Sequence, residues 1–130
     1  MALTSAMEDY LEAVLMMQKR HGYVRCVDVA EQLGVKKPSV SRAVKELSKS
    51  GHLVKNADGT LSLTELGLQF AEQIYEKHQF FTRQLIEAGV PQDIAAQDAC
   101  RLEHVISETS FQKLKEAAFS GSREVIPSDE

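Results

Sequence analysis

The feature that most constrains the fold is a run in the first half of the chain that combines two helical patterns, a turn and a hairpin pattern. VDVAEQLGV (27–35) predicts a short helix that stops at a glycine. KKPSVSRAVKELSKSGHLVK (36–55) predicts a turn and a longer helix with Pro38 in its first turn. LVKNADGTLSL (53–63) predicts two short strands around Asp58-Gly59, a strong hairpin dipeptide. Helix, turn, helix and hairpin in this order indicate a winged helix-turn-helix.

The second helix of this pattern separates an apolar stripe from a basic, polar surface. Val40, Val44 and Leu47 recur at the spacing of a buried helix face. The opposite side combines cations, which suit phosphate or guanine, with small hydroxyls, which allow close approach to a DNA major groove. A further lysine lies beside the hairpin tip, where it can meet the DNA backbone. The predicted DNA-binding residues are Lys36, Lys37, Pro38, Ser39, Ser41, Arg42, Lys45 and Lys55.

Charge is unevenly distributed along the chain, although the net charge is only −4. Residues 24–55 contain seven Lys or Arg against three Asp or Glu, whereas residues 65–130 contain six basic and twelve acidic residues. This asymmetry predicts that one part meets a polyanion and the other meets a cation or a second copy of the chain. We therefore expect double-stranded operator DNA as a partner. Because one recognition helix reads only a few base pairs, we also expect a homodimer.

Helical periodicity continues on both sides of the basic segment. SAMEDYLEAVLMMQKR (5–20) predicts an amphipathic helix with Ser5 as its N-cap and Glu8 completing a capping box. Residues 23–26 predict a short strand. The remaining predicted helices cover residues 65–88, 91–107 and 108–119.

These elements predict a mainly α protein, with a winged helix-turn-helix DNA-binding domain followed by a helical dimerisation domain. Dimerisation is assigned to the C-terminal helices because their apolar faces have little else to cover in so short a chain. The expected boundaries are 1–70 for the DNA-binding domain, 71–120 for the helical domain and 121–130 for a flexible tail.

Composition argues against several other classes of protein. No apolar run approaches the roughly 20 residues needed to cross a bilayer, and the N-terminus has no long apolar segment, so neither a membrane partner nor a secretory signal is expected. Two cysteines do not suggest a disulfide framework, and Cys26 is interpreted as a small buried hydrophobic residue. The expected location is the cytoplasm.

Three separate stretches supply candidate metal ligands. DACRLEHVIS (98–107) places Cys100, Glu103 and His104 at i, i+3 and i+4, on one face of a helix. The first helix offers two carboxylates, and the long helix offers one imidazole. Spacing alone leaves two interpretations open, a metal site or a polar helix face. The full candidate set is Asp9, Glu12, His78, Cys100, Glu103 and His104.

The sequence closely resembles the DtxR/MntR family, the diphtheria-toxin-repressor-like metalloregulators, over about residues 4–119. The resemblance rests on MEDYLEAVL, VDVAEQLGVKKPSVSRAVKEL, TELG, KHQFFTRQL and, above all, DACRLEHVIS. It implies that all six candidates are metal ligands and that the metal binds between the DNA-binding domain and the dimerisation helices. It also implies a dimeric repressor of metal-uptake genes, active when the metal is plentiful. Since the chain ends near residue 130, before the SH3-like third domain of the longer members, the short two-domain type is expected.

The ligand set is a hybrid of two types within that family. Manganese-type members carry Asp at the position of Asp9 and a carboxylate at the position of Cys100, whereas iron-type members carry Met and Cys. A thiolate favours softer ions and carboxylates suit Mn²⁺, so Fe²⁺ is slightly preferred, with Mn²⁺ close behind. Thr82 and Ala96 stand where the iron-type ancillary site has Glu and His, so a second ion in the subunit would share Glu12, Glu103 and His104.

Two alternatives belong to other functional classes. One is a metal-independent, MarR- or PadR-like winged-helix regulator that responds to an organic ligand or a redox signal, with Cys100 as a core residue or sensor. The other is a metalloenzyme that uses Glu103 and His104. An enzyme is not expected, because the sequence has no Gly-rich phosphate loop and no nucleophile elbow.

Overall fold

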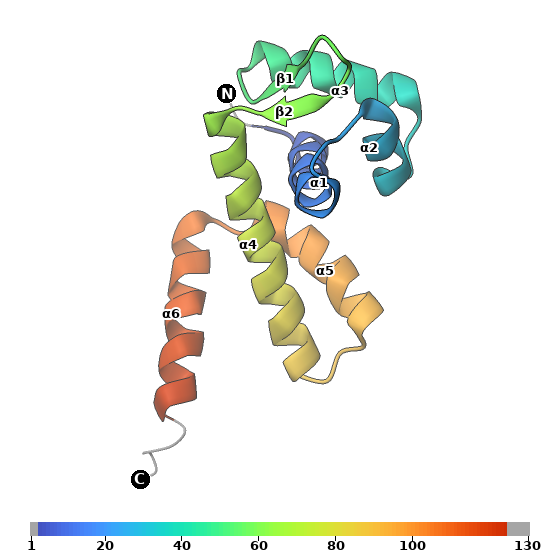
Figure 1. Cartoon of the computed structure of the whole chain (residues 1–130). Coiled ribbons are helices and arrows are strands. Elements are labelled where there is room, and N and C mark those ends of the chain that lie inside the picture. The colour runs from blue at the N-terminus through green and yellow to red at the C-terminus, as the bar shows by residue number, and fades with distance from the viewer. Residues whose placement is uncertain (1–2, 125–130) are drawn as a thin grey trace. The chain divides into compact units, whose positions relative to one another are not determined.

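The computed structural model describes residues 3–124, including the side chains of residues 3–119. The chain divides into two compact units, Met1–Tyr75 and Glu76–Glu130. The boundary falls inside a long helix, α4 (Glu65–Glu87). Figure 1 traces the elements of each unit in chain order: within the described residues there are six helices and one two-stranded sheet. This arrangement confirms the predicted mainly α class.

The first helix, α1 (Ser5–His21), begins where the periodicity predicted, but its cap is different. Thr4 is the N-cap residue, and its Oγ1 accepts a hydrogen bond from the Met7 amide at 3.1 Å. The prediction of Ser5 as N-cap is therefore wrong. Thr4 has the extended backbone that a cap needs, and its hydroxyl satisfies an amide that has no partner within the helix.

The helix-turn-helix consists of α2 (Cys26–Leu33) and α3 (Lys37–Lys49). Gly34 ends α2 with a φ of 67°, a left-handed conformation that glycine adopts without steric cost. Pro38 lies in the first turn of α3, as predicted, where its missing N–H is not needed.

The strand expected over residues 23–26 is reduced to a single bridge between Arg25 and Thr60. Cys26 already begins α2, and the Asp28 carboxylate accepts a hydrogen bond from the Arg25 amide at 2.9 Å. This local cap favours a helix start over a longer strand. Val24 still joins the hairpin, because its carbonyl accepts a hydrogen bond from the Leu61 amide at 2.7 Å.

The predicted hairpin is present as β1 (Leu53–Lys55) and β2 (Leu61–Leu63), two antiparallel strands. Leu53 pairs with Leu63 and Lys55 with Leu61. Gly59 has a φ of 88°, which explains why the turn needs glycine after Asp58. We call residues 53–63 the wing.

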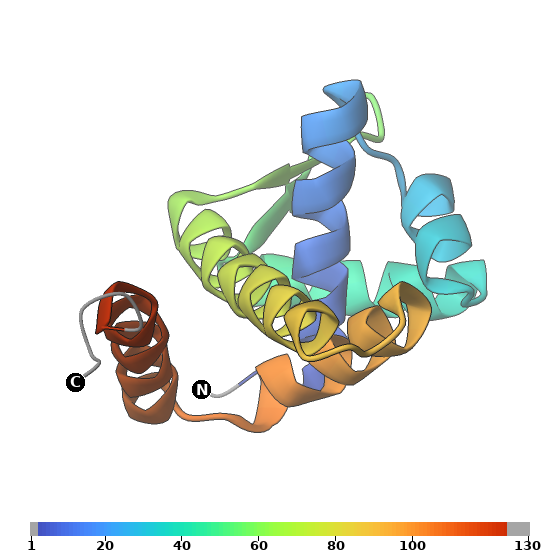
Figure 2. The same cartoon turned by 90° about the horizontal axis from the view of Figure 1, so that it is seen from below.

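One apolar core holds the first unit together. Figures 1 and 2 show α1 lying beside α2 and α3, with the wing on the same unit. The predicted stripe of α3 is buried, since Val40 and Leu47 are fully buried and Val44 is 6% exposed. Cys26 is only half-buried and packs at the edge of this core. The fully buried large side chains of the unit are Leu11, Val14, Val24, Val29, Val40, Leu47, Leu53 and Leu61.

The second unit contains the end of α4, α5 (Gln92–Val105) and α6 (Glu108–Glu124). Phe111 of α6 is fully buried, and its ring lies 5.4 Å from that of Phe80 and 6.0 Å from that of Phe81. This aromatic cluster, together with Ala99, forms a second, smaller core.

The last helix extends into the segment that was predicted as a tail. Because α6 runs to Glu124, residues 121–124 are helical; once a helix exists, each further residue adds a hydrogen bond at little extra cost. The rest of the predicted tail, residues 125–130, lies outside the described residues.

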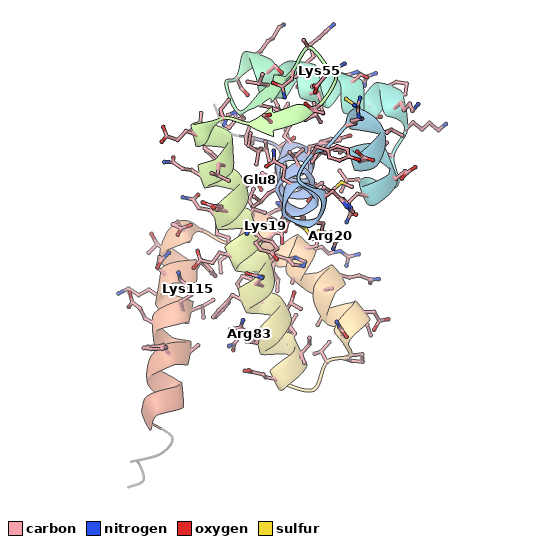
Figure 3. All side chains as sticks on the ribbon, in the orientation of Figure 1. Glu8, Lys19, Arg20, Lys55, Arg83 and Lys115 are labelled. Carbon is pink, nitrogen blue, oxygen red and sulfur yellow. The ribbon has the colours of Figure 1, made fainter. Side chains whose placement is uncertain are left out.

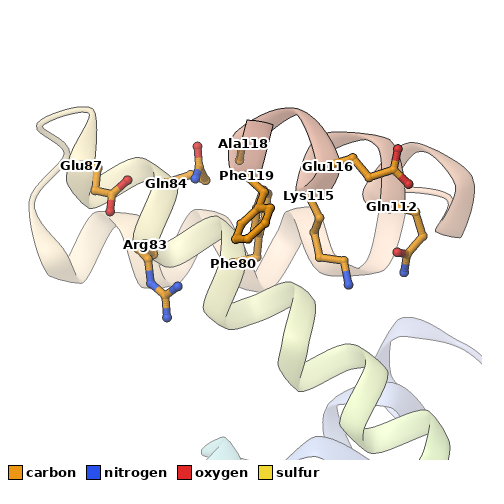
Figure 4. A pocket seen from close by; sticks show the side chains of 9 residues that line it. All are labelled: Phe80, Arg83, Gln84, Glu87, Gln112, Lys115, Glu116, Ala118 and Phe119. Atoms are coloured by element: carbon orange, nitrogen blue, oxygen red, sulfur yellow. The ribbon is translucent and has the colours of Figure 1, made fainter. Parts of the chain in front are cut away.

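Several residues on the expected apolar side of the C-terminal helices are exposed. Ile94 is 46% exposed, Val105 78% and Phe119 67%. Figure 4 shows an open groove between α4 and α6, in which Phe80 and Phe119 meet. Ile94, Val105 and Phe119 keep between 46% and 78% of their surface in solvent within the described part of the chain.

None of the helices in residues 3–124 is both long enough and apolar enough to cross a membrane.

Candidate nucleic-acid interface and metal centre

The predicted DNA-binding residues all lie on the surface of the first unit. Lys36 is the N-cap residue of α3, and the residues from Lys37 to Lys45 occupy roughly its first two and a half turns. Burial of Val40, Ala43, Val44 and Leu47 fixes which face of α3 turns inward, so the basic and hydroxyl side chains are left in solvent. The exposed set is the predicted one in full: Lys36, Lys37, Pro38, Ser39, Ser41, Arg42, Lys45 and Lys55.

The wing adds one exposed lysine to the basic residues of α3 in the same unit. Lys55 is the last residue of β1 and is exposed, as Figure 3 shows on the hairpin beside α3. The wing is held in shape by its own polar side chains, since Asn56 Nδ2 donates to Thr60 Oγ1 at 3.0 Å and to Ser62 Oγ at 2.9 Å. A recognition helix followed by an ordered hairpin is the arrangement that reads a major groove while touching the backbone.

The first unit also carries two of the six candidate metal ligands. Asp9 and Glu12 are three residues apart in α1, so they lie on the same face of that helix. Asp9 is half-buried, whereas Glu12 is only 7% exposed. A carboxylate with so little solvent needs a positive or hydrogen-bonding partner, because burial of an isolated charge is costly.

The other four candidates come together in the second unit, from α4 and α5. His78 Nδ1 lies 2.9 Å from Glu103 Oε1, and His104 Nε2 lies 3.5 Å from Glu103 Oε2. Ligand atoms of Cys100, Glu103 and His104 lie within 4.8 Å of one another. The helix spacing predicted this cluster for α5, and the fold adds His78 from α4.

The burial of these side chains and their donor atoms indicate which ions the cluster could bind. The Glu103 side chain is fully buried, and the side chains of His104 and His78 are 8% and 23% exposed. The four donors combine imidazole nitrogen, carboxylate oxygen and thiol sulfur, which are ligands of Fe²⁺, Mn²⁺ and related divalent ions. The residues present therefore fit a divalent metal.

Two family models together match most of the chain. The model for the N-terminal DNA-binding domain of iron-dependent repressors matches residues 2–61. The model for the metal-binding and dimerisation domain of the same family matches residues 64–119. The chain belongs to the iron-dependent repressor family. This is the DtxR/MntR family that the sequence motifs indicated.

Individual relatives of this repressor agree with the assignment. The regulator MntR of Lysinibacillus sphaericus is 31% identical over 111 residues, which cover 85% of this chain and 80% of MntR. Among solved structures, the manganese regulator SloR superposes with a TM-score of 0.76 at 27% identity and 85% coverage of this chain. IdeR of T. acidophilum superposes with a TM-score of 0.75 at 26% identity and 89% coverage. The chain spans about half the length of these two structures, 52% and 54% respectively.

Family membership decides between the functional classes that the sequence left open. The protein is a metal-dependent transcriptional repressor with a DNA-binding domain and a dimerisation domain. The metalloenzyme alternative is wrong, because members of this family are regulators. The metal-independent alternative lacks support, since the second family model describes a metal-binding domain.

The sequence indicated Arg25 only as one of the basic residues of 24–55, whereas the structure shows that it contacts the wing. Arg25 contacts the wing tip from the start of α2, across 33 positions of the chain. No local sequence motif predicts this contact, because it depends on how the hairpin folds back towards the start of α2.

Proposed function

We propose that the repressor is controlled by Fe²⁺ or Mn²⁺ held by Asp9, Glu12, His78, Cys100, Glu103 and His104. The observation that carries this proposal is the fully buried Glu103 carboxylate, which lies between two imidazoles and near a thiol in the second unit. A bound divalent cation would supply positive charge to a group of carboxylates that otherwise repel one another.

In this proposal the ligands of the two units have different tasks. His78 Nδ1 and Glu103 Oε1 lie 2.9 Å apart, so the imidazole and the carboxylate are close enough to hold one ion from the second unit. Asp9 and Glu12 add hard, charged oxygens from α1. Preference of the metal for the arrangement in which all six donors meet would shift the population towards the DNA-binding state.

The choice of ion depends on the hybrid donor set. The Cys100 sulfur favours Fe²⁺ over Mn²⁺, whereas the three carboxylates suit Mn²⁺. One relative is described as a manganese regulator and the family as iron-dependent, so both ions belong in the test. Thr82 Oγ1 is buried without a hydrogen-bond partner among the described residues, and it offers no charge for a second ion.

The proposed output is repression of metal-uptake genes in the cytoplasm by a dimer. The exposed set on α3 and Lys55 on the wing would contact operator DNA, with the lysines and Arg42 supplying most of the electrostatic affinity.

Titration of the metal-free protein decides the proposal. Metal binding and binding to a duplex selected in vitro from a random-sequence library would be measured anaerobically with Fe²⁺ and Mn²⁺ in parallel. We expect DNA binding to tighten at low metal concentration with at least one ion. If neither ion tightens DNA binding, the proposal that Fe²⁺ or Mn²⁺ controls this repressor is wrong. Tightening by Fe²⁺ alone would assign selectivity to Cys100, and equal or better tightening by Mn²⁺ would assign it to the carboxylates.

Three variants test the ligand set directly. Glu103→Gln should lose metal affinity by roughly a hundredfold or more, since second- and first-sphere changes at metal sites cost about 10- to 100-fold or above. Cys100→Ala should weaken Fe²⁺ more than Mn²⁺. Asp93→Asn is the matched control, because Asp93 is an exposed carboxylate on the same helix outside the set. Normal metal binding by Glu103→Gln would overturn the assignment.

A further inference from the structure

The wing carries an acid at the point where it should approach a polyanion. Asp58 lies in the turn of the wing, and Lys55 is the only basic residue of the wing sequence. An uncompensated carboxylate at the tip would repel DNA phosphates, since like charges at short range disfavour binding.

The exposed Asp58 carboxylate is held by Thr60 of the same turn. Its Oδ1 accepts hydrogen bonds from the Thr60 amide at 3.0 Å and from Thr60 Oγ1 at 2.7 Å. These bonds, together with the nearby Arg25 guanidinium, lower the pKa of Asp58, so the group stays ionised at neutral pH. The tip therefore keeps its negative charge and needs a cation beside it.

Arg25 supplies that cation and also ties the tip in place. Its Nη1 donates to the Asp58 carbonyl at 3.1 Å, and a Cβ on Gly59 would lie 3.3 Å from the same nitrogen. The backbone of Arg25 forms the bridge with Thr60, and its amide is fixed by Asp28 at the start of α2. One residue thus connects the wing tip to the helix-turn-helix through both main chain and side chain.

We propose that Arg25 is a positioning residue for DNA binding: it holds the wing tip and offsets the charge of Asp58, so that Lys55 can meet the DNA backbone. Arg25 acts through the wing rather than as an independent phosphate contact. The proposal rests on the proposed contact between Lys55 and DNA, and it concerns the first unit alone.

A double-mutant cycle tests this role. The metal-loaded full chain would be titrated with the in vitro-selected duplex at several salt concentrations, as wild type, Arg25→Ala, Lys55→Ala and the double variant. We expect Arg25→Ala to weaken binding roughly threefold to tenfold, the size of one lost charge-assisted contact. Because both residues act through one contact, the double variant should be within about twofold of the weaker single variant. The slope of log affinity against log salt should fall by about one in all three.

Arg20→Ala is the matched control, since Arg20 is an exposed arginine in the last turn of α1 and its removal changes the net charge equally. An equal loss in this variant would show that bulk charge explains the effect, and would overturn the proposal. Fully additive losses in affinity and in salt slope would assign Arg25 a direct DNA contact instead. Unchanged affinity of Arg25→Ala would also overturn it.

Amide hydrogen exchange separates this proposal from the proposed function. Arg25→Ala should speed exchange at Thr60 and the neighbouring wing amides by about tenfold, while the amides of α1 stay as in the wild type. Unchanged hydrogen-exchange rates in the wing would show that Arg25 does not hold the wing tip. That result would overturn the proposal even if DNA binding fell. A wild type that selects no duplex in the presence of metal would count against the proposed function, and the exchange result would still decide the role of Arg25.

Discussion

His52 is a buried titratable residue that the predicted interface and metal centre do not use. It is 5% exposed, its Nδ1 lies 2.7 Å from Ser50 Oγ, and its ring meets Phe70 edge-on at 5.0 Å. Burial lowers the pKa of His52, because the charged imidazole loses solvent. The residue therefore links stability of the first unit to pH.

We expect acidification to destabilise the first unit through His52. A histidine with a lowered pKa in the folded state contributes stability that is present above its ordinary pKa and is lost as the pH falls below it. Thermal unfolding of the metal-free protein between about pH 8 and pH 5 should show a falling Tm. His52→Phe, which keeps an aromatic ring, should show a smaller fall. An identical pH dependence in both proteins would contradict this role.

Gly67 is needed for close packing rather than for an unusual backbone angle. A Cβ at this position would overlap the main-chain carbonyl of His52. Since the obstacle is backbone, neither side can relax without moving α4 or β1. Gly67→Ala should lower the free energy of unfolding by about 3 kcal/mol or more, measured by urea denaturation. Leu68→Ala, at an exposed neighbouring position, is the control and should cost less than about 1 kcal/mol.

At the scale of elements, the buried Phe111 ring and two ion pairs are among the contacts that attach α6 to α4. Lys77 and Lys115 lie 5.8 Å and 5.0 Å from the centre of the Phe111 ring. Lys115 pairs with Glu76 at 2.6 Å, and Lys77 with Glu108 at 3.4 Å. The pairs are partly exposed and worth little alone, so burial of Phe111 should dominate the attachment.

The variant Phe111→Ala tests whether burial of this ring contributes more to the attachment of α6 than the ion pairs do. Removal of a fully buried phenylalanine should cost about 3–5 kcal/mol, and the loss should be confined to the second unit. Hydrogen exchange should therefore accelerate in α6 while the amides of α1 and α3 stay protected. Leu114→Ala, at a 44% exposed position on the same helix, should have little effect. If Lys115→Ala cost more than Phe111→Ala, the ion pair rather than the ring would be the main attachment.

At the scale of the whole molecule, the exposed apolar residues of the second unit offer a surface to a second copy of the chain. The family model describes this region as a dimerisation domain, and Phe119 is 67% exposed beside the groove of Figure 4. Phe119→Asp should weaken the dimer by roughly tenfold or more, because a charge would have to be desolvated. Analytical ultracentrifugation measures this, with Ser110→Asp on the same helix as a control of equal charge. An unaltered dimer would place the interface elsewhere on the unit.

Local patterns were sufficient to predict most individual elements. Gly34, Pro38 and Asp58-Gly59 act on their own neighbours, so the turn, the start of α3 and the hairpin followed from sequence. The N-cap prediction failed by one residue, because Ser5 and Thr4 are both suitable caps and only backbone geometry distinguishes them. The expected strand at 23–26 failed because the Asp28 cap and the helix start compete for the same residues.

The candidate site also has one part that the sequence predicted and another part that depends on the tertiary structure. Cys100, Glu103 and His104 share a helix, so their common face was determined by the 3.6-residue period of the sequence alone. The contact between His78 and Glu103 joins residues 25 positions apart, and the contact between Arg25 and the Asp58 carbonyl joins residues 33 apart. Only the tertiary structure decided these contacts, because they depend on how α4 packs on α5 and how the wing folds back, and no local period encodes a distance between separate elements.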